Sequence, residues 1–285
     1  MNDQTPLIRN ISDTALWVAH YRADENDRPD RVFDDPFARS LAGKRGQEIA
    51  GSTKFLKGVA WPFIARTWLI DKIVTEHVQQ GFDTVINLAA GLDTRPYRMA
   101  LPPTLQWIEV DLPDILRYKE EILQNEKPRC QLERVALDLS DRSRRDELFK
   151  RLGSQARKAL VITEGLLIYL KQEQVIQLAE DLAAQPGIQR WVTDLSSPGL
   201  LEMMNRKMGS ALSSANAPFQ FAPEEGPLFF EKYHWKKVEV HSMLKTARTL
   251  NRLPFMLKVM SFLVGGKKPN PRSPWSGVCL FGREN

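Results

Sequence analysis

Apolar positions recur at helical spacing through the first part of the chain, which predicts an N-terminal helical cap over residues 1–82. A first helix is expected over about residues 12–22, where a serine or an aspartate can cap its start. Pro36 suits the first turn of a short second helix, and Gly43 lies beyond its expected end. A third helix is expected over residues 62–80.

From residue 84 the pattern changes to short apolar runs that alternate with helical stretches. Five such runs predict buried strands: Thr84–Leu88, Trp107–Asp111, Leu132–Leu137, Leu160–Thr163 and Arg190–Leu195. Helices between consecutive strands imply right-handed crossovers and a largely parallel sheet. Two later runs, Lys237–His241 and Gly277–Phe281, predict two more strands that pair antiparallel. The expected fold is therefore α/β, with a doubly wound, mostly parallel seven-stranded sheet.

The same pattern predicts one domain over residues 1–285. The helical cap precedes a ligand-binding core at 83–197. The regularity breaks at 198–236, where prolines and methionines accumulate, and this segment is expected to lie over the sheet as a lid or acceptor pocket. Residues 237–285 hold the final strands and helices.

Composition narrows the class of protein. A hydrophobic share of 42% and a charged share of 26% are typical of an ordinary globular chain. The net charge of +5 is small, and the basic run Arg142–Lys158 is interleaved with acids as on a solvated helix. Neither feature predicts a nucleic-acid partner. Cys130 and Cys279 are far apart and have no ligand-spaced companions, so neither a disulfide framework nor a metal site is expected.

No targeting or membrane segment is recognisable. Met1–Asn10 is polar and has no apolar signal core, and the apolar stretch Leu253–Val264 is interrupted by Lys258 and too short to cross a bilayer. We therefore expect a cytoplasmic protein with no membrane partner. Oligomeric state cannot be deduced from the sequence.

An open parallel sheet binds its ligand beyond the carboxyl ends of its strands, and polar side chains gather at those positions here. The first strand leads into a turn that runs to Arg95 and has one glycine and an aspartate, instead of the three glycines of a dinucleotide site. A carboxylate at Asp93 would repel a pyrophosphate but attract a cation such as an α-ammonium group. The alternative is a tight corner with only a structural role.

Acidic residues end the next three strands. Asp111 is placed to accept hydrogen bonds from both ribose hydroxyls of a nucleoside, unless it is only a solvated strand-end acid. Asp138 could hold an adenine amino group while Leu139 packs against the ring. Glu164 lies in apolar sequence, and a buried carboxylate is costly unless it is paired. Its partner is expected to be a cationic ligand group or a structural arginine, either Arg66 or Arg22.

Taken together, these segments resemble the leucine carboxyl methyltransferase family, including its bacterial small-molecule and polyketide O-methyltransferase relatives. The resemblance covers about residues 12–282. It is carried by Thr14–Leu16 through Arg22–Ala23, Asp34–Phe37, Val85–Arg98, Trp107–Pro113, Leu137–Leu139 and Glu164–Leu170. The Gly-Leu-Asp-Thr-Arg turn followed by Tyr97-Arg98 is unusual outside that family.

The resemblance implies a Rossmann-like methyltransferase fold with S-adenosyl-L-methionine as methyl donor and S-adenosyl-L-homocysteine as product. Its implied donor contacts are Ala89, Gly91 and Asp93 at the methionine moiety, Asp111 at the ribose, Asp138 and Leu139 at the adenine, Glu164 at the ammonium region, and Arg66 at the carboxylate, with Arg22 as a second candidate. The family usually has glycine where this chain has Ala89. A positive φ at that position would strain the turn.

The expected reaction is O-methylation of a carboxylate or hydroxyl on a small organic molecule, or of an exposed carboxylate. Methyl transfer is an in-line displacement, so positioning is the main task of the protein. Four histidines are available, and none is in a base-like arrangement, so no catalytic residue is assigned. Six aromatic and methionine side chains in 198–236 suggest an apolar, aromatic or polyketide-like acceptor: Met203, Met204, Phe219, Phe221, Phe229 and Phe230.

Three other functions remain open. A non-catalytic protein that binds S-adenosylmethionine or another nucleoside would keep the fold and the ligand, and a turnover assay would separate it from an enzyme. An NAD-dependent oxidoreductase would need the glycine fingerprint that the first turn lacks. Nucleic-acid methylation would require a contiguous basic face around the acceptor pocket.

Overall fold

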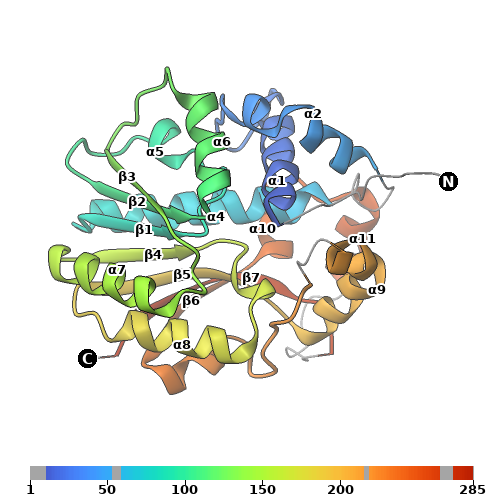
Figure 1. Ribbon diagram of the computed structural model, residues 1–285. Coiled ribbons are helices and arrows are strands. Elements are labelled where there is room, and N and C mark those ends of the chain that lie inside the picture. Colours follow the sequence, from blue (N-terminus) through green and yellow to red (C-terminus); the bar gives the residue numbers. More distant parts are fainter. Residues whose placement is uncertain (1–10, 53–58, 215–217, 264–271, 285) are drawn as a thin grey trace.

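A seven-stranded sheet with helices on both faces forms the centre of the computed structural model (Figure 1). The structure describes residues 11–52, 59–214, 218–263 and 272–284, so Met1–Asn10 lies outside the described residues. The strands are β1 Thr84–Leu88, β2 Gln106–Asp111, β3 Gln131–Ala136, β4 Ala159–Thr163, β5 Ile188–Ser196, β6 Trp235–Ser242 and β7 Ser276–Arg283. Every strand expected from the sequence is present.

The strand order is β3-β2-β1-β4-β5-β7-β6. Neighbouring strands from β3 to β5 pair in parallel, whereas β7 pairs antiparallel with both β5 and β6. The chain order reverses at the junction of β1 and β4, and in such sheets a ligand lies outside the carboxyl ends of the strands at that junction. The expected α/β fold and the antiparallel last pair are confirmed.

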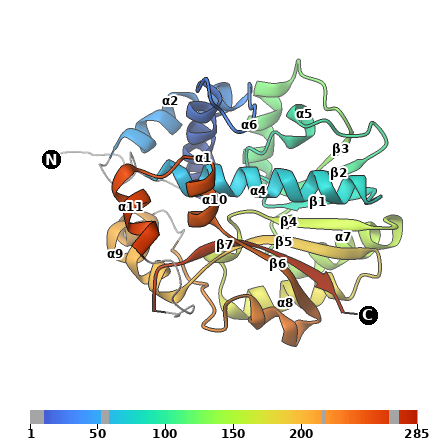
Figure 2. The ribbon, with the colours of Figure 1, turned by 180° about the vertical axis from the view of Figure 1, so that it is seen from behind.

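The helices form two layers, as the two views in Figures 1 and 2 show. The elements are α1 Ile11–Asn26, α2 Ala38–Gly51, α4 Ala60–Gln79, α5 Arg95–Arg98, α6 Pro113–Leu123, α7 Arg142–Gln155, η1 Leu167–Tyr169, α8 Gln172–Ala183, α9 Pro198–Ser214, η2 Gly226–Tyr233, α10 Met243–Thr249 and α11 Phe255–Leu263. The apolar faces of α4 and α10 pack on one side of the sheet, and those of α7 and α8 on the other.

Gly43 divides α2 into two helical segments. It lies inside α2 with φ 54° and ψ −168°, a backbone conformation that kinks the helix, and the chain continues helically to Gly51. Only glycine adopts this region of φ/ψ space readily, so Gly43 ends a short helical segment as expected, and a second segment follows it to Gly51.

The segment 198–236 does not stay together over the sheet edge. Helix α9 begins directly after β5, at the carboxyl end of the parallel strands, but η2 packs against β6 and α8 in the core. Phe221, Phe229 and Phe230 are buried there beside Trp191 and Trp235. Burial in this core explains their aromatic character without an acceptor.

None of the helices in the described part of the chain is both long enough and apolar enough to span a bilayer.

Candidate functional site

A cavity of about 990 Å³ opens at the carboxyl ends of the parallel strands. Its walls come from α1, α4, the turns after β1 and β4, the end of β5, and parts of α9, α10 and α11. The volume lies at the upper end of the range of about 300–1,000 Å³ for small-molecule sites. The cavity therefore has room for a nucleoside and for part of a second molecule.

Six of the eight residues expected to bind the donor line this cavity: Arg66, Ala89, Gly91, Asp93, Asp111 and Glu164. The other two, Asp138 and Leu139, are outside its lining in the part of the chain that the structure describes. Asp138 is exposed and its Oδ1 accepts a hydrogen bond from the Ser140 amide at 2.8 Å. Leu139 is half-buried against the core. The two residues expected to bind the adenine therefore lie outside the cavity lining, whereas those expected to bind the methionine moiety line the cavity.

The turn after β1 is held in a strained conformation. Ala89 has φ 54°, in the left-handed region that favours glycine. Gly91 also has a positive φ of 49°, and a Cβ placed there would lie 3.4 Å from the Cβ of Ala15 on α1. Helix α1 therefore closes directly over the turn, and the glycine at 91 leaves space between the two.

Asp93 is fixed from three directions. Its Oδ2 accepts hydrogen bonds from Asn87 Nδ2 and Arg95 Nη1, both at 2.7 Å, and its Oδ1 accepts one from the Arg95 amide at 2.8 Å. Burial alone would raise the pKa of Asp93, but the charges of Arg95 and Lys119 outweigh it and hold that pKa well below its usual range. The carboxylate is therefore held in its ionised form, with hydrogen bonds to both oxygens.

Glu164, at the end of β4, lies between two arginines. Its Oε1 accepts from Arg66 Nε at 2.9 Å and its Oε2 from Arg95 Nη1 at 2.8 Å. Burial opposes ionisation, but the two guanidinium groups lower the pKa of Glu164. The expected structural partner Arg66 is thus present, whereas Arg22 pairs with Asp35 and the Leu92 carbonyl instead.

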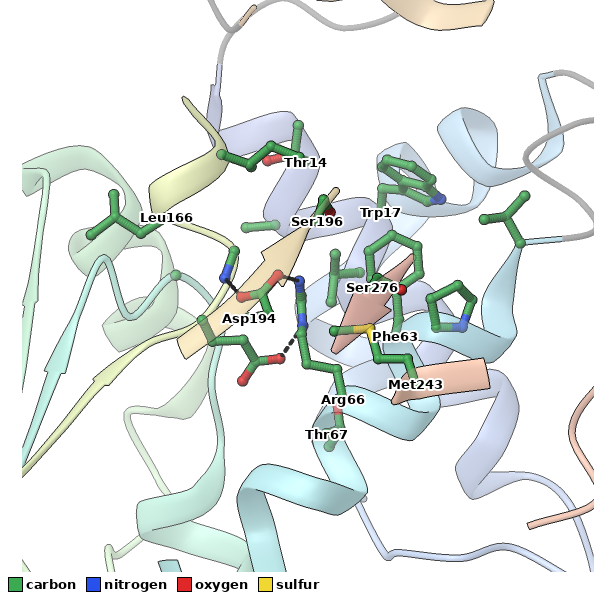
Figure 3. Close-up of a pocket in the computed structure, with 18 of the residues that line it drawn as sticks. Thr14, Trp17, Phe63, Arg66, Thr67, Leu166, Asp194, Ser196, Met243 and Ser276 are labelled. Atoms are coloured by element: carbon green, nitrogen blue, oxygen red, sulfur yellow. Dashed lines mark hydrogen bonds and ion pairs between the residues drawn. The ribbon is translucent and has the colours of Figure 1, made fainter. Parts of the chain in front are cut away.

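Asp194, at the end of β5, is a site residue that the sequence pattern did not reveal. Its Oδ1 accepts a hydrogen bond from the Gly165 amide at 2.6 Å and its Oδ2 one from Arg66 Nη1 at 3.1 Å (Figure 3). Gly165 has φ 67°, and a Cβ there would lie 3.3 Å from Arg66 Nη1. Its position could have revealed it, because Asp194 is an acid near the carboxyl end of the fifth parallel strand, where the other expected site acids also lie.

Arg95 was not predicted either, although it is the centre of the charge cluster. It is only 2% exposed and also donates from Nε to Asp71 on α4 at 2.6 Å. Nothing local in the sequence distinguishes this arginine from a surface one. Besides the neighbouring Asp93, its carboxylate partners are Asp71 and Glu164, which are 24 and 69 residues away along the chain.

These contacts form one continuous ion network at the cavity floor. Its members are Arg22, Arg66, Arg95 and Arg98 with Asp35, Asp71, Asp93, Glu164 and Asp194. Four guanidinium groups face five carboxylates, so the network carries one excess negative charge. A site of this kind favours a guest with a net positive charge, because a buried uncompensated charge is costly.

Asp111, at the end of β2, also lines the cavity. Its Oδ2 accepts a hydrogen bond from the Gly91 amide at 2.6 Å and its Oδ1 one from the Leu112 amide at 2.7 Å. Burial raises the pKa of Asp111, and the hydrogen bond from Gly91 opposes that rise. Each carboxylate oxygen keeps a free lone pair that can accept a ligand hydroxyl.

The remaining wall of the cavity is largely apolar. It includes Trp17 and Phe63 beside the ion network, and Met203, Met204 and Phe219 from the 198–236 segment. Figure 3 shows Phe63 and Met243 close to Arg66, whose guanidinium lies 5.3 Å from the Phe63 ring centre. Of the six apolar residues expected to contact an acceptor, three therefore line the cavity and three do not.

None of the four histidines lines the cavity: His20, His77, His234 and His241 all lie elsewhere. In the described part of the chain, no group of three or more His, Cys, Asp or Glu side chains could hold a metal ion. Both cysteines are buried and unpaired.

Comparison with known proteins shows the class of protein to which this chain belongs. The leucine carboxyl methyltransferase profile matches residues 15–183. A relative from Parafrankia sp. (strain EAN1pec), named as an S-adenosyl-L-methionine-dependent methyltransferase, is 33% identical over 199 residues, which is 66% of this chain and 61% of the relative. One from Mycobacteroides abscessus with the same name is 30% identical over 84% of this chain and 75% of its own length.

A crystal structure from Thermobifida fusca YX, described as that of a methyltransferase, shares the fold with a TM-score of 0.59 at 15% identity, and the match covers 98% of this chain and 96% of that one. The protein belongs to the leucine carboxyl methyltransferase family of S-adenosyl-L-methionine-dependent methyltransferases.

Proposed function

We propose that this protein is an O-methyltransferase that transfers the methyl group of S-adenosylmethionine to a carboxylate or hydroxyl of a small, largely apolar molecule. The observation that carries the proposal is the pairing of Arg66 with Glu164 and Asp194 beside an open apolar wall. The charged floor suits the zwitterionic amino-acid end of the donor, and the apolar wall suits a hydrophobic acceptor.

The residues present fit the donor. The hydrogen bonds of Arg66 to the rest of the described chain use Nε and Nη1, which leaves Nη2 for the donor carboxylate. Glu164 and the excess negative charge of the network favour the donor ammonium group. Asp111 has free lone pairs for the ribose hydroxyls, and Asp138 with Leu139 remain the proposed adenine contacts.

Bound S-adenosylmethionine would supply a methyl group activated by its sulfonium sulfur. The chain would contribute position: Arg66 and Asp111 would anchor the carboxylate and the ribose of the donor, and the apolar wall would orient the acceptor and exclude water. Fixing two reactants in this way can lower the barrier by about 7–11 kcal/mol. A carboxylate acceptor is already anionic at neutral pH and needs no base, which agrees with the position of the four histidines.

Calorimetric titration with S-adenosylhomocysteine tests the donor site, with NAD as the control ligand and Asp111→Ala as the variant. We expect micromolar binding of S-adenosylhomocysteine, no binding of NAD, and loss of binding in the variant. Absence of binding to the wild-type chain would contradict the proposal.

A turnover assay separates the enzyme from a non-catalytic binding protein. The purified chain would be incubated with S-adenosylmethionine and either 1-naphthoate or 1-naphthol, and methylated product measured by mass spectrometry. Product from either acceptor supports O-methylation, and product from only one identifies the acceptor group. We expect Phe219→Ala to raise the acceptor KM, with exposed Leu228→Ala as the control. Donor binding without turnover of any acceptor would favour the non-catalytic alternative.

A further inference from the structure

Helix α11 has an apolar outer face that is open to solvent. Phe255, Met256 and Val259 are 80%, 76% and 47% exposed. Phe255 and Met256 are the two most exposed large hydrophobic side chains in the described part of the chain. Exposed apolar groups clustered in this way commonly mark an interaction site. We call these three residues the α11 surface.

The α11 surface lies next to the cavity. Leu257, on the same helix, lines the cavity, as do Met243 and Leu244 on α10. Figures 1 and 2 show α9 and α11 side by side at the end of the molecule where the parallel strands terminate. The helix therefore separates the cavity from the surroundings and is apolar on both sides.

The sequence around α11 is exclusively basic. Between residues 243 and 272 there are seven lysines and arginines and no aspartate or glutamate: Lys245, Arg248, Arg252, Lys258, Lys267, Lys268 and Arg272. The whole chain has only five more basic than acidic residues, so this segment carries more positive charge than the entire protein. Glu25 and Asp30, two acids from the N-terminal part of the chain, pair with Arg252.

We propose that the α11 surface binds peripherally to a membrane that contains anionic lipid. Apolar side chains on a short helix enter the headgroup boundary, and flanking lysines and arginines are attracted to anionic headgroups. A second copy of this chain is a poorer partner, because a two-fold contact would bring two basic segments together. The expectation of no membrane partner rested on the lack of a spanning segment, and interfacial binding needs none.

The α11 surface lies beside the apolar wall of the cavity, where an apolar acceptor would bind. An apolar acceptor dissolved in the membrane would reach the protein beside α11, a step that rests on the proposed function. Binding to the membrane itself does not depend on that function.

Sedimentation with vesicles tests the proposal on the full chain. We expect binding to vesicles of equimolar phosphatidylcholine and phosphatidylglycerol, weaker binding to phosphatidylcholine alone, and a decrease with added salt. The double variant Phe255→Asp/Met256→Asp should lower the partition coefficient at least about tenfold. The control Leu228→Asp/Val238→Asp changes side chains that are 49% and 48% exposed on η2 and β6 and should bind like wild type.

Three results would overturn the proposal: no binding of wild type to the anionic vesicles, equal binding by the Phe255→Asp/Met256→Asp variant, or the same loss in the control. A dimer in sedimentation equilibrium that only the Phe255→Asp/Met256→Asp variant abolishes would instead assign the surface to a second copy. S-adenosylhomocysteine affinity, measured on the same proteins, should not change. Vesicle binding without S-adenosylhomocysteine binding would support the membrane proposal and contradict the proposed function.

Discussion

At the scale of single residues, Asp194 offers the sharpest test of the site. Its carboxylate touches Arg66 and Gly165, so it would position the arginine that anchors the donor carboxylate. We expect Asp194→Asn to weaken S-adenosylhomocysteine binding about tenfold or more, since a hydrogen bond between charged groups contributes about 1.5–3 kcal/mol. Methylthioadenosine lacks the amino-acid group, and its binding should be unaffected.

Calorimetry with both ligands measures this difference. Asp181→Asn is a matched control, because Asp181 pairs with Arg145 at 2.6 Å and has similar burial outside the cavity. Equal losses for the two ligands would show that Asp194 has only a structural role.

Ala89 provides a second test at this scale, through its positive φ. A non-glycine residue in this region is strained by about 1–2 kcal/mol, and glycine loses about 0.5–1 kcal/mol more backbone entropy on folding. We therefore expect Ala89→Gly to raise the free energy of unfolding by up to about 1 kcal/mol in urea denaturation. Ala90→Gly, at a position without positive φ, should lower it. Destabilisation by both variants would argue against strain at Ala89.

How far the site could be predicted depended on the range of the interactions. Asp111 ends β2, Glu164 directly follows β4 and Asp93 lies in the turn after β1, so their place at the sheet edge could be predicted. Arg95 and Asp194 also contact residues far away along the chain, on α4 and directly after β4, and no local pattern indicates such partners. Strain at Ala89 could be predicted only on the condition that its φ is positive, because residue type alone does not determine φ.

At the scale of elements, the strands were the most predictable part because buried parallel strands form uninterrupted apolar runs. Boundaries agreed within about two residues, as expected for elements set by such runs. The break at Gly43 was predicted, but the helical segment that follows it and the burial of η2 against β6 were not. The prolines of residues 198–236 indicated an irregular segment, but they did not indicate where in the fold that segment packs.

Gly43 gives a prediction at this scale. Its φ of 54° and ψ of −168° belong to a region open essentially to glycine, so Gly43→Ala should lower the free energy of unfolding by about 1–3 kcal/mol. Gly51, at the end of the same helix, serves as the control, because a Cβ added there would have no neighbour within 4 Å. Urea denaturation should show Gly51→Ala within about 0.5 kcal/mol of wild type. An equally stable Gly43→Ala chain would mean that the kink relaxes freely.

At the scale of the whole molecule, the buried ion network links stability to pH. The pKa values of Asp93 and Glu164 are lowered in the folded chain from ordinary values of 3.8 and 4.5. Their contribution is therefore fully present above those ordinary values and is lost as pH falls through the lower folded values. We expect the free energy of unfolding to be nearly constant near neutral pH and to fall steeply on acidification.

Urea denaturation across the acidic range measures this dependence. Glu164→Gln should be less stable at neutral pH and show a shallower decline, because it has one carboxylate fewer to protonate. A wild-type curve with the same slope as the variant would contradict a role for Glu164 in acid stability.

The position of β7 has a consequence for synthesis. This strand, residues 276–283, lies between β5 and β6, so β6 is made earlier but has no neighbour in the sheet until β7 leaves the ribosome. Until then the exposed edges of β5 and β6 are open to pairing with other nascent chains. A strand translated after both of its neighbours therefore completes the interior of the sheet, and chaperone demand during expression should depend on how quickly residues 276–283 emerge.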